Sequence, residues 1–356
     1  MIQISNFLSR VKFKNKLLYL AYIFLVVSIF MEVLVRMYPG WIPPHLVEYM
    51  SPSAIEVISK SRGQVQEKGS PIYHYIPNSK LNWYPHVAID ENGYRNKTKN
   101  QLSVDSVFLG DSIVFAKRSK KDLADLSRDN NISALNLAMS GYSPLHYRDV
   151  YKKYIVDRKI SHKKVIVNIF VGNDFDDSLR YPWEIKINPK GNPSFPWIIN
   201  LLVGVLENRK GVKQYNVQLK ESKHKVKLPY RKINIRYLWW PTLPDKEKWE
   251  KTSSALYDIV SYARSMNAEP VFVVIPSPAS VYGLSLYKDF KRYTDVHIDV
   301  VKMFRKEFKS ENVKIIDTLN SLAAAVEEQF LYVDESDCHF NTHGTKVLYS
   351  IINKNM

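Results

Sequence analysis

Gly110, Asp111 and Ser112 stand directly after a short apolar run in the segment VFLGDSIVFA. A serine hydroxyl becomes a nucleophile only when a neighbouring base, held by a third group, removes its proton. At a turn from a strand to a helix the hydroxyl is exposed, and the serine amide can face a developing oxyanion. Taken alone, this tripeptide fits an ordinary turn or helix N-cap better, so a catalytic role requires partner residues elsewhere in the chain.

Three further elements come in order along the chain. NLAMSGYSP contains Gly141, where a missing side chain lets a backbone amide approach a ligand closely. VNIFVGNDFDD contains Asn173, whose side-chain amide could donate to the same oxyanion. YVDESDCHFNTHGTKVL contains Asp337 and His339, an acid and a base two residues apart, which would complete a nucleophilic triad.

This ordered set resembles the SGNH hydrolase family, also called GDSL-like lipases and acylhydrolases, over roughly Ser106 to Ile352. The resemblance implies a flavodoxin-like three-layer α/β/α fold with a parallel sheet. It also implies Ser112 as nucleophile, His339 as general base and Asp337 as the residue that orients the base. The oxyanion hole would consist of the Ser112 amide, the Gly141 amide and the Asn173 side chain.

Three positions depart from the family pattern. Ile113 replaces the leucine of the GDSL motif, and Gly172 directly precedes Asn173, where the family usually has one residue between them. The acid lies two residues before His339, whereas most members have an offset of three. Asp334 is therefore an alternative to Asp337 as the orienting acid.

We expect no cofactor and no metal. His343 lies four residues after His339, a spacing that suits zinc on one face of a helix. However, Asn341-Thr342 indicates a helix start between them, and the glutamate of a metallohydrolase helix motif is absent.

Two other polar or aromatic groups have ordinary interpretations. An acidic run fits a solvated loop or a helix N-terminus better than a cation site; it comprises Asp174, Asp176 and Asp177. Two aromatic groups could stack on sugar rings, although packing is the commoner role; they are Tyr181-Pro182-Trp183 and Trp239-Trp240.

Short β-branched runs alternate with longer helical stretches, which predicts βαβ units around a parallel sheet. The expected strands are Ser106–Leu109, Ala134–Leu137, Lys164–Phe170, Pro270–Ile275 and Val313–Ile316. Helices are expected over Lys248–Met266 and from Thr342 onward, and Val87–Asn96 is expected to form a strand followed by a glycine turn.

The N-terminal region contains a long apolar segment, Leu17 to Val35, interrupted only by Glu32. Its length matches the ~20 residues that cross a bilayer, and its composition is apolar on every side, unlike a core helix. Four basic residues precede it, and only Arg36 follows closely, so the positive-inside rule predicts a cytoplasmic N-terminus. No small-residue cleavage site follows, which favours an uncleaved signal anchor over a removable signal peptide.

The net charge of +16 suits an anionic partner such as phospholipid, acidic polysaccharide or nucleic acid. Much of this charge lies in Asn208–Arg236, which has ten Lys or Arg residues and one acid. This basic insertion fits a hairpin or flap, either simply solvated or facing an anionic glycan or lipid. The single cysteine, Cys338, excludes an internal disulfide framework and a multi-cysteine zinc site.

These features predict a cytoplasmic N-terminus (1–16), a single-pass anchor (17–35), a linker or cap (36–100) and an extracytoplasmic hydrolase domain (101–356) with the basic insertion at about 208–236. The N-terminal anchor and the ending D-x-H-F-N-x-x-G resemble bacterial members tied to cell-surface polysaccharide modification. The expected activity is acyl transfer through an acyl-Ser112 intermediate, to water as an esterase or to a sugar hydroxyl as an O-acyltransferase, on an O-acetylated polysaccharide. A lipid-directed esterase and a non-catalytic glycan-binding or assembly protein are the alternatives. Nucleic acid is not an expected partner, because the basic domain would face away from the cytoplasm.

Overall fold

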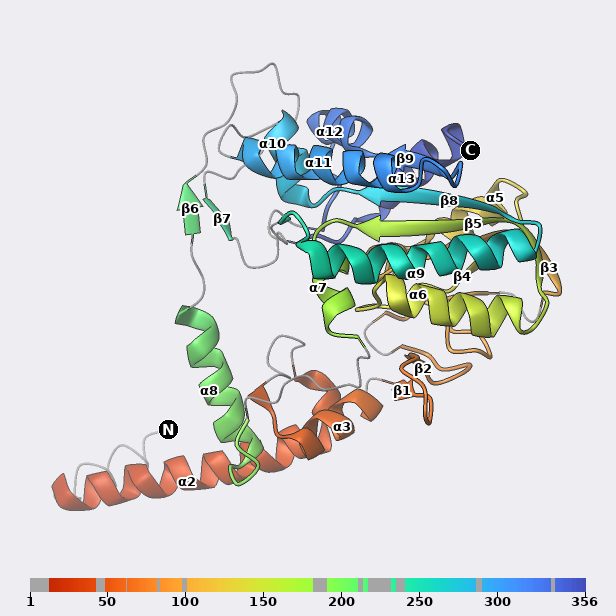
Figure 1. The fold of residues 1–356 in the computed structure, drawn as a ribbon. Helices are drawn as coiled ribbons and strands as arrows, with labels where there is room; N and C mark the ends of the chain where they lie inside the picture. The colour runs from red at the N-terminus through yellow and green to blue at the C-terminus, as the bar shows by residue number, and fades with distance from the viewer. Residues whose placement is uncertain are drawn as a thin grey trace. The chain divides into compact units, whose positions relative to one another are not determined.

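The computed structural model describes residues 13–42, 49–61, 63–81, 84–97, 101–181, 191–210, 214–216, 232–234, 241–285, 290–333 and 337–356. Two compact units divide the chain (Figure 1). The smaller unit joins Met1–Arg62 to Ile185–Gly211, and the larger joins Gly63–Glu184 to Val212–Met356. Residues 63–97 of the predicted linker or cap thus belong to the larger unit.

The smaller unit is helical. Its elements are α2 (Phe13–Met37), the 3-10 turn η1 (Pro39–Trp41), α3 (Pro52–Ser61) and α8 (Trp197–Lys210). A small apolar core joins them, with Ile42, Met50, Ala54, Ile55, Ile58 and Trp197 buried. Among the described residues, Leu18–Met37 of α2 is the one stretch long and apolar enough to cross a membrane, and most of its side chains are exposed.

The larger unit contains a parallel sheet of five strands in the order β4-β3-β5-β8-β9. The strands are β3 (Ser103–Leu109), β4 (Ala134–Asn136), β5 (Ser161–Phe170), β8 (Glu269–Ile275) and β9 (Lys314–Asp317). Each overlaps an expected strand, and the order by position along the chain is 2-1-3-4-5, that of flavodoxin. The flavodoxin-like α/β fold is therefore confirmed.

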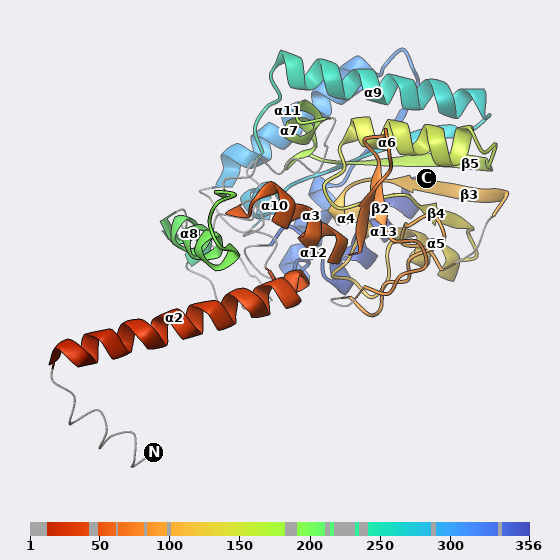
Figure 2. The same ribbon diagram turned by 90° about the horizontal axis from the view of Figure 1, so that it is seen from below.

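Helices cover both faces of this sheet, as the view from below shows (Figure 2). One face carries α6 (Pro144–Tyr151) with the π-helical turn η3 (Lys152–Val156), α9 (Lys246–Ser265) and α11 (Lys291–Glu307). The other carries α5 (Leu123–Asp129) and α13 (Thr342–Lys354), with α12 (Leu319–Glu328) beside α13. Short helices α4 (Ser112–Phe115), α7 (Asp174–Leu179) and α10 (Pro278–Ser285) follow β3, β5 and β8.

Aromatic side chains pack helices α9 and α11 against one face of the sheet. Phe272 on β8 contacts Phe308, which follows α11, with ring centroids 5.0 Å apart. Trp249 on α9 contacts Phe304 on α11 at 5.1 Å. Both predicted helices, Lys248–Met266 and the closing helix from Thr342, are confirmed as α9 and α13.

Two short antiparallel pairs lie outside this sheet. Strands β1 (Gln64–Gln66) and β2 (Tyr73–Tyr75) pair with each other. Within the basic insertion, β6 (Gln214–Asn216) pairs with β7 (Lys232–Asn234), as the arms of a hairpin do.

The prediction of a strand within Val87–Asn96 is wrong. Only isolated pairs form there, Lys80 with Ala88 and Ile89 with Arg95, around a turn. The Asp90 carboxylate accepts hydrogen bonds from the amides of Asn92 and Tyr94 at 2.8 and 2.9 Å. An aspartate that bonds its own backbone in this way favours a turn over a sheet ladder.

Substitution of Gly93 in this turn tests how tightly the turn is packed. Its φ is +84°, and an added Cβ would lie 2.3 Å from the Tyr75 carbonyl oxygen. We therefore expect Gly93→Ala to lower the free energy of unfolding by more than the ~1–2 kcal/mol that a left-handed backbone alone costs. Chemical denaturation followed by circular dichroism measures this change. Gly69→Ala is the matched control, because φ is +72° there but no atom lies within 4 Å. Equal losses in the two variants would contradict the packing argument.

Candidate active site

Ser112 is the first residue of α4, immediately beyond the carboxyl end of β3. Asp111 caps this helix by accepting a hydrogen bond from the Ile113 amide at 2.8 Å. Gly110 is required by close packing, because an added Cβ would lie 2.4 Å from Val114 Cγ2. Ser112 is partly exposed, while the residues on either side of it are buried. The sequence thus presents one hydroxyl to solvent on an otherwise buried turn.

The Asp111 carboxylate lies beside Ser112 and has a raised pKa. Burial raises its pKa to about 7, although hydrogen bonds from the Ile113 amide and from the amide and hydroxyl of Ser112 act in the opposite direction. One carboxylate oxygen, Oδ2, is buried without a hydrogen-bond partner among the described residues.

Gly141 lies in the loop between β4 and α6, with a φ of +84°. The Tyr73 hydroxyl donates to the Ser140 carbonyl at 2.8 Å, and an added Cβ on Gly141 would lie 2.8 Å from that hydroxyl oxygen. Tyr142 is in turn buried and donates to the Tyr73 carbonyl at 2.5 Å. Tyr73 and Tyr142 therefore hold the loop whose amide was predicted to face the oxyanion.

Asn173 precedes α7, at the carboxyl end of β5. Its Nδ2 donates to the Asp177 carboxylate at 2.6 Å, and its Oδ1 is buried without a partner among the described residues. An amide nitrogen has two hydrogens, so this bond fixes the side chain and leaves one N–H to donate elsewhere. Burial raises the pKa of Asp177 to about 7, against the lowering effect of the charge on Arg180.

Asp337 and His339 form a hydrogen-bonded pair. Asp337 Oδ1 accepts from both the ring nitrogen Nδ1 and the backbone amide of His339, at 2.5 and 2.8 Å. A carboxylate only accepts, so Nδ1 carries the proton and Nε2 is the basic nitrogen. His339 Nε2 is buried without a hydrogen-bond partner among the described residues. Asp334, the alternative acid, lies outside the described residues.

Electrostatic and backbone contacts connect this pair to the segment after Ser112. Burial lowers the pKa of His339, the hydrogen bond that its ring donates to Asp337 opposes this, and the Lys117 charge lowers the pKa further. The Lys120 amide donates to Thr342 Oγ1 at 3.3 Å, beside the start of α13. Ser112, Gly141 and Asn173 follow the adjacent strands β3, β4 and β5, so they share the carboxyl edge of the sheet at its topological switch point.

Arg95 is a supporting residue that the sequence did not indicate. Its buried guanidinium donates to the carbonyls of Phe115 and Ala116 at 3.0 and 2.5 Å, just after the Ser112 helix. It also donates to the carbonyls of Ser119 and Lys120, both at 3.1 Å. Its charge is balanced by Asp122, whose carboxylate lies 3.3 Å from Nε. No local sequence pattern predicts this role of Arg95, because its partners lie 20 to 27 residues further along the chain.

The acidic run after β5 is a helix N-terminus rather than a solvated loop. Asp174 and Asp177 are buried in the first turn of α7. The Tyr147 hydroxyl donates to Asp174 at 3.0 Å, whereas the exposed Asp176 pairs with Lys248 at 2.7 Å. Tyr181 packs against the His146 ring at 4.9 Å. Trp183 and Trp239-Trp240 lie outside the described residues.

Asp337, Cys338 and His339 offer ligand atoms within 4.8 Å of one another, as a metal site requires. The chemistry fits less well, because burial raises the pKa of the Cys338 thiol and His339 Nδ1 already bonds Asp337. Metal ligation needs a thiolate and a free imidazole nitrogen.

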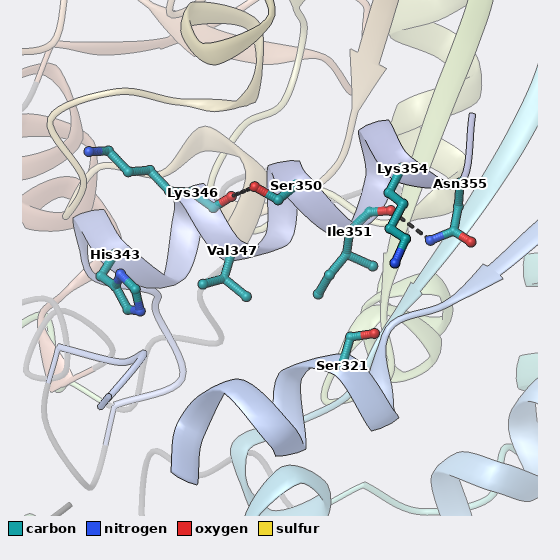
Figure 3. A pocket seen from close by; sticks show the side chains of 8 residues that line it. All are labelled: Ser321, His343, Lys346, Val347, Ser350, Ile351, Lys354 and Asn355. Carbon is teal, nitrogen blue, oxygen red and sulfur yellow. Dashed lines mark hydrogen bonds between the residues drawn. The ribbon is translucent and has the colours of Figure 1, made fainter. Parts of the chain in front are cut away.

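His343 lies apart from this cluster and lines a groove of about 410 Å³ between α12 and α13 (Figure 3). The groove is lined by Ser321, His343, Lys346, Val347, Ser350, Ile351, Lys354 and Asn355, and none of these is a predicted catalytic residue.

No protein-family model matches the chain, and no curated protein matches it in sequence. Solved structures do match. A GDSL-like lipase from Bacteroides thetaiotaomicron has a TM-score of 0.36 and 8% identity, covering 70% of this chain and 86% of its own. A putative G-D-S-L lipolytic protein from Desulfitobacterium hafniense has a TM-score of 0.40 and 11% identity, covering 71% and 99%. An acetylxylan esterase from Geobacillus stearothermophilus has a TM-score of 0.37 and 10% identity, covering 71% and 93%.

These structures carry the names of the family that the motifs resemble.

The role of Arg95 can be tested by Arg95→Lys, which keeps the charge but loses the planar fork of donors. We expect the free energy of unfolding to fall by about 2–4 kcal/mol, because buried carbonyls lose their donors. Arg158→Lys, at an exposed arginine that bonds Asn92, should change it by less than about 0.5 kcal/mol. Denaturant unfolding of both variants measures the difference. Similar small losses would show that the four carbonyls do not depend on Arg95.

Proposed function

We propose that this chain is a serine-dependent ester hydrolase or O-acyltransferase of the SGNH type. The observation that carries the proposal is the Asp337–His339 pair, in which the basic nitrogen Nε2 is buried and has no partner among the described residues. The segment that follows Ser112 lies close enough for its Lys117 charge to lower the pKa of His339. Ser112 is the nucleophile, His339 the general base and Asp337 the residue that orients it.

The first half-reaction can be derived from these roles. Ser112 Oγ attacks the ester carbonyl carbon while its proton moves to His339 Nε2. The tetrahedral intermediate then collapses, the bond to the leaving oxygen breaks, and His339 returns the proton to that oxygen. An acyl-Ser112 ester remains. Asp337 stabilises the imidazolium through the hydrogen bond to Nδ1.

The oxyanion hole is formed by the amides of Ser112 and Gly141 and by Asn173 Nδ2. Tyr73 and the Ser140 carbonyl support the Gly141 loop, and Asp177 fixes the Asn173 amide. Donors that are held in place before the reaction stabilise the developing negative charge without reorganisation.

The second half-reaction uses water, which releases the acid, or a sugar hydroxyl, which accepts the acyl group. Either acceptor attacks the acyl-Ser112 carbonyl and loses a proton to His339; the bond to Ser112 Oγ then breaks, and His339 returns the proton to that oxygen. We propose an O-acetylated cell-surface polysaccharide as substrate. The support is the candidate anchor, for which the positive-inside rule predicts a cytoplasmic N-terminus and therefore a site outside the cytoplasm, and the net charge of +16, which suits an acidic polymer.

The proposed serine chemistry predicts covalent labelling of the full chain by a fluorophosphonate probe. Ser112→Ala should abolish labelling because the nucleophile is gone, and His339→Ala should slow it at least ~100-fold because the base is gone. Ser350→Ala, at an exposed serine of the α12–α13 groove, is the control and should label at the parent rate. Labelling that survives in Ser112→Ala would refute the assignment. Absence of labelling in the folded parent chain would favour a non-catalytic binding protein.

The pH dependence of hydrolysis tests the assigned base. Burial lowers the pKa of His339, so the acid limb of kcat/KM for a short-chain nitrophenyl ester should have its midpoint below 6.5. Asp337→Asn removes a hydrogen bond and charge that raise this pKa, so the midpoint should fall, together with kcat. Lys117→Gln removes a charge that lowers it, so the midpoint should rise. Lys302→Gln on the exposed side of α11 should leave the midpoint unchanged. Shifts of the same sign in the Asp337 and Lys117 variants would show that His339 is not the titrating base.

A further inference from the structure

Helix α8 is apolar on two faces. Its first ten residues, Trp197–Leu206, contain one polar side chain, Asn200, which is buried and bonds the backbone of Asn192 in both directions at 3.1 Å. One face packs inward, where Trp197 is buried and Gly204 lies so close to the Tyr49 ring that an added Cβ would be 2.8 Å from it. The opposite face exposes Ile199, Leu202, Val203 and Leu206. A helix with no polar face is expected in a core or in lipid rather than against water.

Glu32 of α2 fixes the start of this helix. Its two carboxylate oxygens accept hydrogen bonds from the amides of Trp197 and Ile198 at 3.1 and 2.8 Å. Arg36 bonds the same carboxylate at 2.6 Å, and its guanidinium lies 5.3 Å from the centre of the Trp197 ring. These contacts satisfy the one acidic group in the apolar stretch of α2, a group that would otherwise be costly in lipid. They also fix α8 at a defined level along α2.

The depth of the start of α8 in the membrane can be estimated from the residues at the end of α2. Arg36 is followed by Tyr38 and Trp41, whose exposed rings stack with centroids 4.7 Å apart. Tyrosine, tryptophan and arginine of this kind gather at the boundary between lipid and water. Glu32 lies one helical turn before Arg36, or roughly 6 Å deeper at 1.5 Å per residue. Interfacial helices typically bury their apolar face about 5–10 Å into this boundary.

The length of α8 fits the same location. The ten residues Trp197–Leu206 extend roughly 15 Å as a helix, half of the ~30 Å hydrocarbon core, so this apolar part of α8 is too short to span it. Figure 1 shows α8 leaving α2 at a steep angle, as a helix in the membrane plane does beside one that crosses the membrane.

We propose that α8 is a second membrane-contacting element, which lies in the interface at the Arg36 end of α2 with Ile199, Leu202, Val203 and Leu206 against the lipid acyl chains. The occupant of this face is lipid rather than protein, because the face adjoins α2 at Glu32 and is as free of charge as the exposed surface of α2.

The inference rests on the proposed anchoring of α2, and the test separates the two. Single cysteines for a nitroxide label are placed on the full chain with Cys338 replaced by alanine, and the chain is reconstituted into vesicles of phosphatidylethanolamine and phosphatidylglycerol. Leu202→Cys and Leu206→Cys report on α8. Val26→Cys on exposed α2 is the lipid reference, and Lys302→Cys on exposed α11 is the water reference. Collisions with oxygen, which concentrates in lipid, are compared with collisions with a water-soluble nickel chelate.

We expect the ratio of oxygen to nickel collisions at positions 202 and 206 to exceed that at 302 several-fold and to approach that at 26. A lipid-like ratio at 26 with a water-like ratio at 202 and 206 would overturn the role of α8 and leave the anchor intact. Water-like ratios at all four positions would overturn the anchor and the inference together. Exclusion of both reagents from 202 and 206 would show that protein, such as a second copy of this chain, covers the face, and would also overturn the inference.

Discussion

The site depends on the buried guanidinium of Arg95. Helix α4 contains only four residues, so it cannot satisfy the carbonyls at its own end. Its last residue is followed by Ala116 in the left-handed region, at a φ of +52°, and the chain then turns away from the sheet. Arg95 donates to four carbonyls of this turn and is paired with Asp122, which is itself bonded by Asn136 at 2.9 Å. The position of Ser112 thus depends on the guanidinium of Arg95, which belongs to a segment that precedes the sheet in the sequence.

A second constraint is a group of buried carboxylates that lie next to the proposed oxyanion donors, Ser112 and Asn173. Asp111, Asp174 and Asp177 are buried near one another, and the charge of Asp111 raises the pKa of both Asp174 and Asp177 in addition to the effect of burial. Three ionised carboxylates there would oppose the formation of an oxyanion. The raised pKa values of Asp174 and Asp177 reduce this opposition, and the hydroxyl of Tyr147 donates to Asp174. Asp177 of the same cluster accepts from the Asn173 side-chain amide and holds it in place.

The sequence predicts well what depends on local pattern. The five strands are short apolar runs, and each lies where the pattern indicates, because strands buried on both faces need continuous apolar residues. The Asp337–His339 contact could also be predicted, since both residues belong to one short segment. By contrast, Arg95 donates hydrogen bonds to carbonyls twenty or more positions away in the sequence. Asp174 and Asp177 have pKa values that are raised by burial, which the sequence does not reveal. The strand predicted within Val87–Asn96 fails for a local reason, because the hydrogen bonds of Asp90 to the amides of Asn92 and Tyr94 favour a turn despite the apolar alternation.

The two-residue offset between acid and base has a structural consequence of its own. In this short segment one oxygen of Asp337 accepts from both the amide and the ring of His339, so the acid holds the backbone and the side chain of the base together. The ring is then fixed with Nδ1 protonated, which leaves Nε2 as the acceptor. Both bonds to one oxygen hold the proposed base rigidly, whereas the segment after Ser112, the proposed nucleophile, is held by Arg95 from a different part of the chain.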